Sequence, residues 1–477
     1  MIANPFTAQD WNAVAPLFIV GFTALAVLLA DLVAPKQPSR YVPIGIGIAG
    51  LAAAGVYAGS EYFAPAHDAF GGGFILGGFS IVLQAIIVVA AIFSLGLYGT
   101  IGKAQGVAGA TALLLWSTSG AMLMAGAANL MTIFLGLELL SLALYCLCGL
   151  ADRPASRESA LKYLILSSTA SGFLLFGMAL LFGTSGSVAL SALSSPALAA
   201  NPLYWIGGGL FLAGLAFKLS LVPFHVWSPD VYEGAPLPVT AFMSVVTKAA
   251  TIAVFARFAY AAIAPGASGA MLLPFYIIAG ISMIAGNLGM LAQTDMKRLL
   301  AYSGIAQIGY IVAALAGASA LGVRYAIYYL AAYAFMNLGA FATVALLSGE
   351  NEEGSRIAAF QGLAQRRPFL AAAMTFFLLA LAGFPPTAGF LGKILILSTN
   401  VSTGYPWLAG LLIAGTAISL YAYFKVIRLM YEPHARPYAG VSARAPLAYL
   451  SLAICLAALL VMTFYPLTPS NVLPLAK

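Results

Sequence analysis

Apolar runs about 20 residues long recur along nearly the whole of this 477-residue chain. A helix of that length crosses the hydrocarbon core of a bilayer, where no water is present to satisfy an unpaired backbone group. Only 7% of the residues are charged and 62% are hydrophobic. A soluble domain carries about 25% charged residues, because its surface faces water. The sequence therefore predicts an all-α, polytopic membrane protein.

About fourteen membrane spans are predicted, and the segments between them are too short to form a soluble domain. The spans cover residues 12–33, 42–60, 74–98, 106–126, 129–150, 159–182, 203–224, 237–262, 271–292, 299–318, 322–347, 369–398, 405–430 and 446–466. Loops that follow odd-numbered spans hold nearly all the loop cations, which are Lys36, Arg40, Lys103, Arg153, Arg157, Lys297, Arg298, Arg356, Arg366, Arg367, Arg436 and Arg444. The positive-inside rule places these loops in the cytoplasm and both termini on the outer side. The net charge of +7 is thus a topology signal and does not indicate nucleic-acid binding.

Two predicted spans contain helix-breaking sequences. The seventh ends in FKLSLVPFHVW, where Pro223 lacks an N–H and obstructs the preceding turn. The twelfth contains LAGFPPTAGFLGK, with Pro385 and Pro386 between two glycines. Opened backbone at membrane depth is tolerated only against protein or a water-filled cavity, and in transporters it marks the binding pathway.

The two breaks also suggest an internal repeat. ALKYL at 160–164 is similar to AIYYL at 326–330, an offset of 166 residues, and Pro223 and Pro386 are 163 residues apart. A repeat of five spans places its second copy upside down, because five is odd. From these residues alone, a chance likeness between apolar helices is an equal alternative.

Four ionisable side chains lie deep within predicted spans, where each costs about 2.5–3.5 kcal/mol to insert. They are Glu138 in LGLELLSL, Lys218 before the first break, Lys248 in SVVTKAATIAVF, and Lys393 after the second break. One acid cannot neutralise three lysines, and lysine, unlike arginine, can release its proton in an apolar interior. We predict that these residues move protons. The alternative is that they only hold helices together.

Two further residues are weaker candidates. Lys162 lies about one turn inside the sixth span, so it either approaches Glu138 across a helix hairpin or extends to the membrane interface. His225 lies beside the first break, where a proton relay and helix capping are equally compatible with the sequence. Asp230 and Glu233, in WSPDVYEGAP, are interpreted as solvated loop acids. The chain has no cysteine spacing for an iron–sulfur cluster and no phosphate-binding loop, so no cofactor or metal is predicted for it.

Four segments resemble the N-type antiporter-like membrane subunits of bacterial NADH–quinone oxidoreductase, respiratory complex I. They are ESALKYLILSS, KLSLVPFHVWSPDVYEGAPLPVTAFMS, QTDMKRLLAYSGIAQIGY and LAGFPPTAGFLGK. The resemblance spans about residues 106–430, and PDVYEGAP is its most specific string. Sister subunits and related cation/proton antiporters usually carry a Trp-Leu-Pro-type run there. M-type subunits typically have glutamate at the position of Lys393.

The resemblance implies fourteen helices arranged in two inverted five-helix repeats with two broken helices. The expected units are a three-helix segment at 1–105, repeats at 106–265 and 266–431, and a C-terminal helix at 432–477. The resemblance also implies roles for six residues. These are the fifth-helix glutamate Glu138, its sixth-helix partner Lys162, the lysines Lys218, Lys248 and Lys393 of the seventh, eighth and broken twelfth helices, and His225 of the hydrophilic axis.

The function implied is proton translocation across the bacterial inner membrane, coupled to NADH oxidation and quinone reduction in other subunits. The chain is then part of a translocating enzyme without a redox centre of its own. FMN, iron–sulfur clusters and quinone are expected in partner subunits. Expected partners are the other membrane and peripheral subunits of complex I, including neighbouring antiporter-like subunits, and the lipid bilayer. The alternatives are a subunit of a multi-subunit sodium/proton antiporter and a purely structural membrane subunit.

Overall fold

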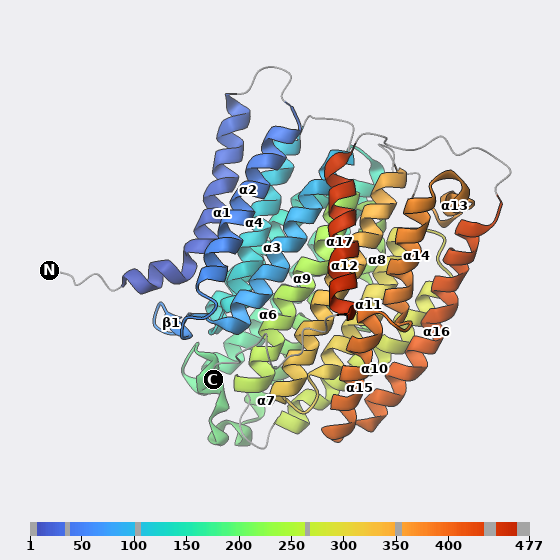
Figure 1. Cartoon of the computed structure of the whole chain (residues 1–477). Helices are drawn as coiled ribbons and strands as arrows, with labels where there is room; N and C mark the ends of the chain where they lie inside the picture. The colour runs from blue at the N-terminus through green and yellow to red at the C-terminus, as the bar shows by residue number, and fades with distance from the viewer. Residues whose placement is uncertain are drawn as a thin grey trace.

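The computed structural model describes residues 7–33, 39–100, 106–262, 268–348, 355–433 and 445–464. Its helices run side by side in one bundle (Figure 1). Twelve helices in these ranges are long and apolar enough to cross a membrane. The helix Met296–Ala314 and the two short helices of the broken twelfth span complete the fourteen predicted crossings. Four of the loop cations lie outside the described residues, namely Lys36, Lys103, Arg436 and Arg444.

The N-terminal segment consists of three helices and a small hairpin at one edge of the bundle (Figure 1). The helices are α1 (Ala8–Leu32), α2 (Tyr41–Ser60) and α3 (Gly78–Leu97), and α3 is followed by the single turn η1 (Tyr98–Thr100). Strand β1 (His67–Ala69) pairs antiparallel with β2 (Phe74–Leu76). The prediction that the third span starts at residue 74 is therefore wrong. Gly71 and Gly72 have φ of +61° and +81°, which turns the chain into a hairpin before the helix begins.

The first repeat contains an unbroken helix pair, a long helix, a broken helix and a fully buried helix. Its elements are α4 (Val107–Gly126), α5 (Leu130–Cys148), α6 (Pro154–Ser185), η2 (Leu190–Ser194), η3 (Pro196–Ala200), α7 (Pro202–Leu219), α8 (Trp227–Gly234) and α9 (Leu237–Arg257). The predicted eighth span reached residue 262, but the α-helix ends at Arg257 and a π-helical turn, Phe258–Ala262, follows it.

The second repeat has the same order of elements. They are α10 (Ser268–Leu291), α11 (Met296–Ala314), α12 (Ala320–Ser348), η6 (Ile357–Phe360), α13 (Leu363–Arg366), α14 (Pro368–Ala382), α15 (Ala388–Ser402) and α16 (Pro406–Tyr431). The C-terminal helix α17 (Pro446–Phe464) packs against α12.

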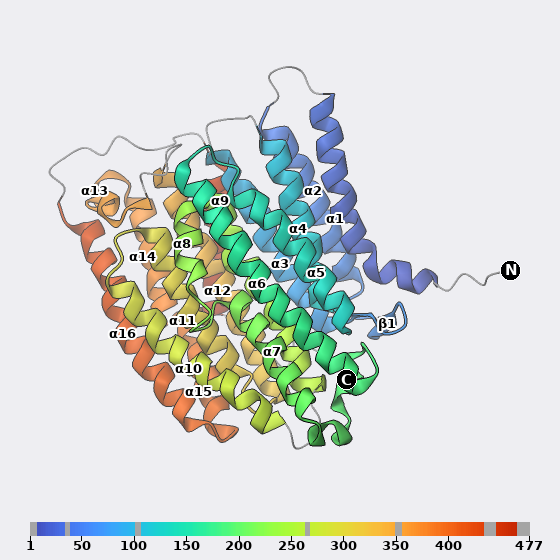
Figure 2. The same cartoon turned by 180° about the vertical axis from the view of Figure 1, so that it is seen from behind.

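A backbone contact within the first group of helices has an equivalent within the second group, about 166 residues further along the chain. The N–H of Leu190 donates to the carbonyl of Ala128 at 3.1 Å, and the N–H of Ile357 donates to that of Thr294 at 2.8 Å. The two broken helices run in opposite directions. α7 and α15 lie toward one end of the bundle, and α8 and α14 toward the other (Figures 1 and 2). The chain therefore contains two inverted five-helix repeats.

Both predicted breaks are present. α7 ends at Leu219 because Ser220 is in the left-handed region, with φ of +58°. Gly383 ends α14 with φ of +77°, and Thr387 caps α15 by accepting the N–H of Phe390 at 3.3 Å. Residues 220–226 and 383–387 are therefore not α-helical, although each segment connects two halves of one span. The carbonyl groups at the ends of α7 and α14 therefore lack partners within their own helices and can accept hydrogen bonds inside the bundle.

Candidate functional site

Lys218 lies in the last turn of α7, directly before the first break, and is 2% exposed. Its Nζ donates to Ser141 Oγ on α5 at 2.7 Å and to Ser167 Oγ on α6 at 2.6 Å. The hydroxyl of Tyr145 also donates to Ser167 Oγ, at 2.7 Å. The C-terminal end of a helix favours a cation. Lys218 is thus held by two neutral hydroxyls where three helices meet.

Glu138 lies one turn before Ser141 on α5 and is half-buried. Its Oε1 accepts a hydrogen bond from Ser171 Oγ of α6 at 2.8 Å. Ser167 and Ser171 are four residues apart, so they lie on the same face of α6. A row of hydroxyl groups on α5 and α6 therefore leads from Glu138 to Lys218.

Lys248 lies on α9 and is 2% exposed. Its Nζ donates to Ser220 Oγ at 2.5 Å and to the carbonyl oxygen of Lys218 at 3.3 Å. The last carbonyls of a helix have no partner within that helix, so the break makes this one available. The ring of Trp227, the first residue of α8, lies 5.4 Å from the same Nζ, within cation–π distance. All three contacts of Lys248 come from the broken helix.

Lys393 repeats this arrangement in the second repeat. It lies on α15 and is 4% exposed. Its Nζ donates to the carbonyl oxygens of Leu381 at 3.1 Å and Ala382 at 2.9 Å, at the end of α14. The ring of Tyr310 lies 4.9 Å from this Nζ. Each break thus supplies carbonyl acceptors to a buried lysine.

Polar side chains on α9 and α12 connect the surroundings of Lys248 to the second repeat. Ser244 lies one turn before Lys248 on α9, and its Oγ accepts from Asn337 Nδ2 at 2.6 Å. The hydroxyl of Tyr333 donates to the carbonyl of Ser244 at 3.2 Å. Asn337 and Tyr333 are four residues apart on α12, so they lie on one face of that helix.

The same face of α12 continues toward Lys393. Tyr329, one turn before Tyr333, donates its hydroxyl to Gln307 Oε1 on α11. Gln307 Nε2 in turn donates to the carbonyl of Leu381 at 3.0 Å. This is the carbonyl to which Lys393 also donates. Polar groups therefore extend across the bundle from Glu138 to Lys393, and we call them the polar row.

The charged residues of the polar row could be predicted from the sequence, but its uncharged residues were not predicted. These are Ser141, Tyr145, Ser167, Ser171, Ser220, Ser244, Gln307, Tyr329, Tyr333 and Asn337. Gln307 and Asn337 gave a usable signal, because a buried amide is costly unless it is hydrogen-bonded. The serines gave none, since a serine hydroxyl can bond to its own helix backbone.

Lys162 is paired with acids other than Glu138. Its Nζ lies 2.7 Å from Glu158 Oε1 and 3.2 Å from Asp230 Oδ2. The predicted approach to Glu138 is not present in the structure. Glu138 bonds to Ser171, which lies nine residues, or about 13.5 Å, further along α6 than Lys162. Lys162 therefore lies outside the polar row.

The interpretation of Asp230 and Glu233 as loop acids is wrong, although Glu233 is exposed to solvent as predicted. Both lie on α8, and Arg298 of α11 donates from one guanidinium nitrogen to Asp230 Oδ1 at 2.6 Å and to Glu233 Oε2 at 2.9 Å. Their side chains are 34% and 48% exposed. A helical first turn tolerates Pro229, whose missing N–H would be unpaired there in any case.

His225 lies between α7 and α8 and is half-buried. Its ring centroid is 6.5 Å from that of Tyr302, and its Nδ1 has no hydrogen-bond partner among the described residues. The carbonyl of His225 accepts the N–H of Ser228 at 2.9 Å. Capping is thus performed by the main chain of His225, and its imidazole lies beside the break without joining the polar row.

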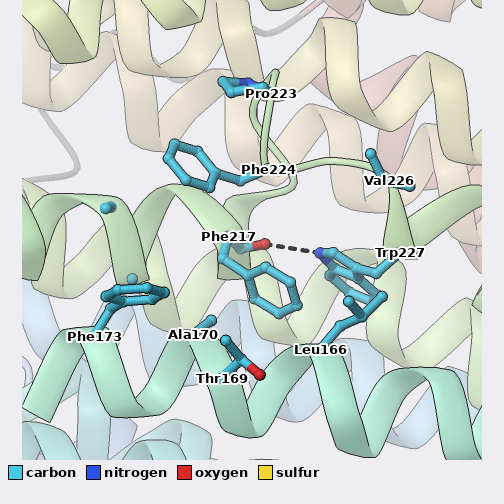
Figure 3. A pocket seen from close by; sticks show the side chains of 11 residues that line it. Leu166, Thr169, Ala170, Phe173, Phe217, Pro223, Phe224, Val226 and Trp227 are labelled. Carbon is cyan, nitrogen blue, oxygen red and sulfur yellow. Dashed lines mark hydrogen bonds between the residues drawn. The ribbon is translucent and has the colours of Figure 1, made fainter.

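A cavity of about 260 Å³ opens beside the first break (Figure 3). It is lined by α6, α7 and the connection to α8, mainly through apolar side chains such as Phe173 and Phe224. Trp227 forms one wall, and its Nε1–H donates to the carbonyl of Phe217 at 2.9 Å. The six candidate residues are not among the residues that line this cavity. Within the described ranges, no cluster of three or more His, Cys, Asp or Glu could hold a metal ion.

Inverted repeats, two broken helices and buried lysines bonded to the broken ends define an antiporter-like membrane subunit. Residues 127–419 match the family NADH:quinone oxidoreductase/Mrp antiporter, TM. NADH-quinone oxidoreductase subunit N 1 of Symbiobacterium thermophilum is 39% identical, over 98% of this chain and 98% of the relative. Subunit N of Trichlorobacter lovleyi is 37% identical, over 98% and 96%. The chain belongs to the family of NADH-quinone oxidoreductase subunit N.

Solved structures show the same fold. A chain of respiratory complex I from Thermus thermophilus with bound Aureothin is 32% identical and superposes with a TM-score of 0.83, covering 96% of this chain and 99% of that one. A chain of the Mrp complex from Dietzia sp. is 19% identical with a TM-score of 0.77, covering 96% and 99%. The likeness to the Mrp complex concerns the fold alone. The fold prediction is therefore confirmed, and relatedness in sequence favours the oxidoreductase over the antiporter alternative.

Proposed function

We propose that this chain is a proton-translocating subunit of an NADH-quinone oxidoreductase, and that Glu138, Lys218, Lys248 and Lys393 carry the protons. The observation that supports the proposal is the polar row, in which each lysine donates to neutral hydroxyl or carbonyl oxygens. Such acceptors do not fix the charge of a lysine as a directly bonded carboxylate would. Each lysine can therefore exchange its proton with the next group.

In the proposed sequence, Lys218 takes a proton from the cytoplasmic side while the charged Glu138 lies nearby. Lys162 is bonded to Glu158 and Asp230, so the charge of Glu138 acts on Lys218. If Glu138 then moves away from Lys218, Lys218 loses its counter-charge and its proton passes toward Lys248 and Lys393. We assign His225 a relay role beside the break, where its imidazole has an unpartnered nitrogen within the described residues.

Release to the outer side is proposed to occur from Lys393 along α15. Asn400 lies seven residues further on, and seven residues make about two turns, so the two side chains share one helix face. Asn400 is fully buried, and neither atom of its amide has a hydrogen-bond partner in the described parts of the chain. An unpaired buried amide is well suited to bind water.

The chain is a multi-pass membrane protein and one subunit of a larger complex. We assign the redox chemistry, with its FMN, iron–sulfur clusters and quinone, to other subunits, and no redox centre to this chain. We further propose that the complex lies in the inner membrane, with both termini of this chain on the periplasmic side. The positions of the loop cations support this orientation. Arg366 ends α13 and Arg40 precedes α2, and α13 lies at the same end of the bundle as the start of α2 (Figure 1), which the positive-inside rule assigns to the cytoplasm.

The recurring backbone contacts also support the proposed division of the chain. We place the N-terminal segment at 1–105, the two inverted repeats at 106–265 and 266–431, and the C-terminal helix at 432–477. The boundary at 265 falls between the π-helical turn after α9 and the start of α10.

Replacing Glu138 by alanine tests the proposal. Because the variant removes the counter-charge of Lys218, NADH-driven proton pumping and coupled quinone reduction should both fall several-fold in membrane vesicles, while the complex still assembles. Glu432→Ala, at an exposed end of α16 in an ion pair with Arg428, is the control and should pump normally. A purely structural subunit predicts the reverse for Glu138→Ala, with poor assembly and normal turnover per assembled complex.

A second test concerns the connection between the two repeats. Asn337→Leu keeps the size of the side chain but removes the amide that bonds to Ser244. If protons cross at this point, pumping should fall several-fold while quinone reduction is less affected. Asn12→Leu, at an exposed position of α1, is a matched control. Equal pumping by both variants would contradict a path through α12.

A further inference from the structure

The short helix α8 contacts the surroundings of two lysines in the polar row. Its first residue, Trp227, stacks on Tyr163 with ring centroids 4.8 Å apart and planes 13° apart. Lys248 Nζ lies 5.4 Å from the Trp227 ring, and Lys218 Nζ lies 5.6 Å from the Tyr163 ring. Any displacement of α8 therefore moves an aromatic ring that faces a buried ammonium group.

Three residues later, α8 is bound to other parts of the bundle by ion pairs. Asp230 Oδ1 accepts from Arg298 at 2.6 Å, and Asp230 Oδ2 accepts from Lys162 at 3.2 Å. Glu233 accepts from the same nitrogen of Arg298 at 2.9 Å. Asp230 thus joins α6 and α8 of the first repeat to α11 of the second repeat.

Arg298 itself is held at a fixed place. Asp295 caps α11 by accepting the N–H of Lys297 at 2.8 Å and of Arg298 at 3.2 Å. Ser355 Oγ donates to Asp295 at 2.5 Å. Lys297 Nζ donates to the carbonyl of Ala235, directly after α8, at 3.0 Å. The start of α11 therefore contacts α8 along its length and again just past its end.

The ion pair between Arg298 and Asp230 is partly shielded from water, so it can hold α8 in place against α11. The side chains of Arg298 and Asp230 are only 32% and 34% exposed. Fully solvated pairs contribute little, because water screens them and the long side chains lose freedom when they pair. Here one guanidinium bonds two carboxylates from successive turns of α8, which restrains both the position and the rotation of that helix.

We propose that Arg298 is a positioning residue for the proton-carrying lysines of the first repeat. It acts through Asp230 and Glu233, which hold α8 so that Trp227 faces Lys248 and packs on Tyr163 beside Lys218. The inference rests on the proposed proton transfer and adds a coupling between the two repeats. A movement of the start of α11 would displace α8, an eight-residue helix, and with it the Trp227 ring that faces Lys248.

Arg298→Gln tests this role in the assembled complex. We expect NADH-driven proton pumping per assembled complex to fall by about fivefold, which corresponds to about 1 kcal/mol. The pH profile of pumping should also shift along the pH axis, because the environment of the lysines has changed. Arg298→Lys keeps a cation beside the two acids and should recover part of the loss. Arg428→Gln is the matched control, since Arg428 pairs with Glu432 within α16 and its side chain is 83% exposed.

A charge exchange separates positioning from a general need for ion pairs. Asp230→Arg combined with Arg298→Asp restores a bridge between α8 and α11 but places a cation beside Lys162. We expect this double variant to pump better than either single variant. If its loss equals the product of the two single losses, the proposed action through α8 is wrong. It is also wrong if Arg298→Gln only lowers the amount of complex, with turnover per complex and pH profile unchanged.

Lys218→Ala in the same membranes distinguishes this inference from the function on which it rests. Loss of pumping in Lys218→Ala together with normal pumping in Arg298→Gln removes the positioning role alone. Normal pumping in both variants would contradict the proposed function as well. Should the double variant not assemble, the comparison of Arg298→Gln with Arg298→Lys decides: equal losses in the two contradict a role for the cation at this position.

Discussion

Replacing Lys218 by alanine is expected to lower proton pumping by at least about tenfold, equivalent to about 1.4 kcal/mol or more. The variant removes the ammonium group between Glu138 and Lys248 but leaves the hydroxyls of Ser141 and Ser167 in place. Because those hydroxyls can bond to each other or to water, assembly should be preserved. Pumping in inverted membrane vesicles, normalised to the amount of complex, measures the effect. Lys425→Ala, on the exposed face of α16, is the control and should have no effect.

Arginine at the same position distinguishes proton transfer from a fixed charge. Lys218→Arg keeps a positive charge that a protein cannot deprotonate. If Lys218 must release its proton, the arginine variant should pump as poorly as the alanine variant. Should Lys218→Arg pump like the wild type while Lys218→Ala does not, Lys218 serves only as a charge and the proposed transfer step is wrong.

The second large effect is expected from Gly389→Ala, at the start of α15. A Cβ atom at this position would overlap the carbonyl oxygen of Ala380 and lie 3.1 Å from Met336 Sδ. The carbonyl belongs to the α14 backbone and cannot move as a side chain can. Overpacking of this kind typically costs about 1–3 kcal/mol and occasionally more. We therefore expect a large drop in the amount of folded subunit and in its apparent unfolding temperature in detergent.

Gly410→Ala provides the matched comparison for Gly389→Ala. Gly410 lies on α16, and a Cβ there would meet no atom within 4 Å. Alanine is the better helix former, so this variant should be as stable as the wild type or slightly more stable. Equal stability of the two alanine variants would show that the α14–α15 packing tolerates a larger residue at position 389.

Most of the fold could be predicted because membrane spans leave a strong signal of length and hydropathy. The breaks at Pro223 and at Pro385–Pro386 could also be placed, since proline lacks the N–H that a helix needs. The start of the third span could not. Phe74, Ile75 and Leu76 are as apolar as the helix that follows, and only the glycines before them mark a turn.

The candidate site divides in the same way. Glu138, Lys218, Lys248 and Lys393 could be identified because burying a charge in a membrane is costly. The pairing of Lys162 with Asp230 could not, because it depends on how α6 and α8 are rotated against one another, whereas Glu158 lies four residues before Lys162 on the same helix and could have been recognised as a partner. Hydropathy carries no information about that rotation. For the same reason the hydroxyls of α5 and α6 were missed.

The serine partners of Lys218 have a consequence for how it can change state. A hydroxyl is both a donor and an acceptor, and its hydrogen rotates freely about the C–O bond. While Lys218 is an ammonium, Ser141 and Ser167 present lone pairs to it. Once Lys218 becomes an amine, either serine can swing its hydrogen round and donate to the nitrogen. One contact is then reversed while an N–H of the amine keeps the other, and neither protonation state requires movement of a helix.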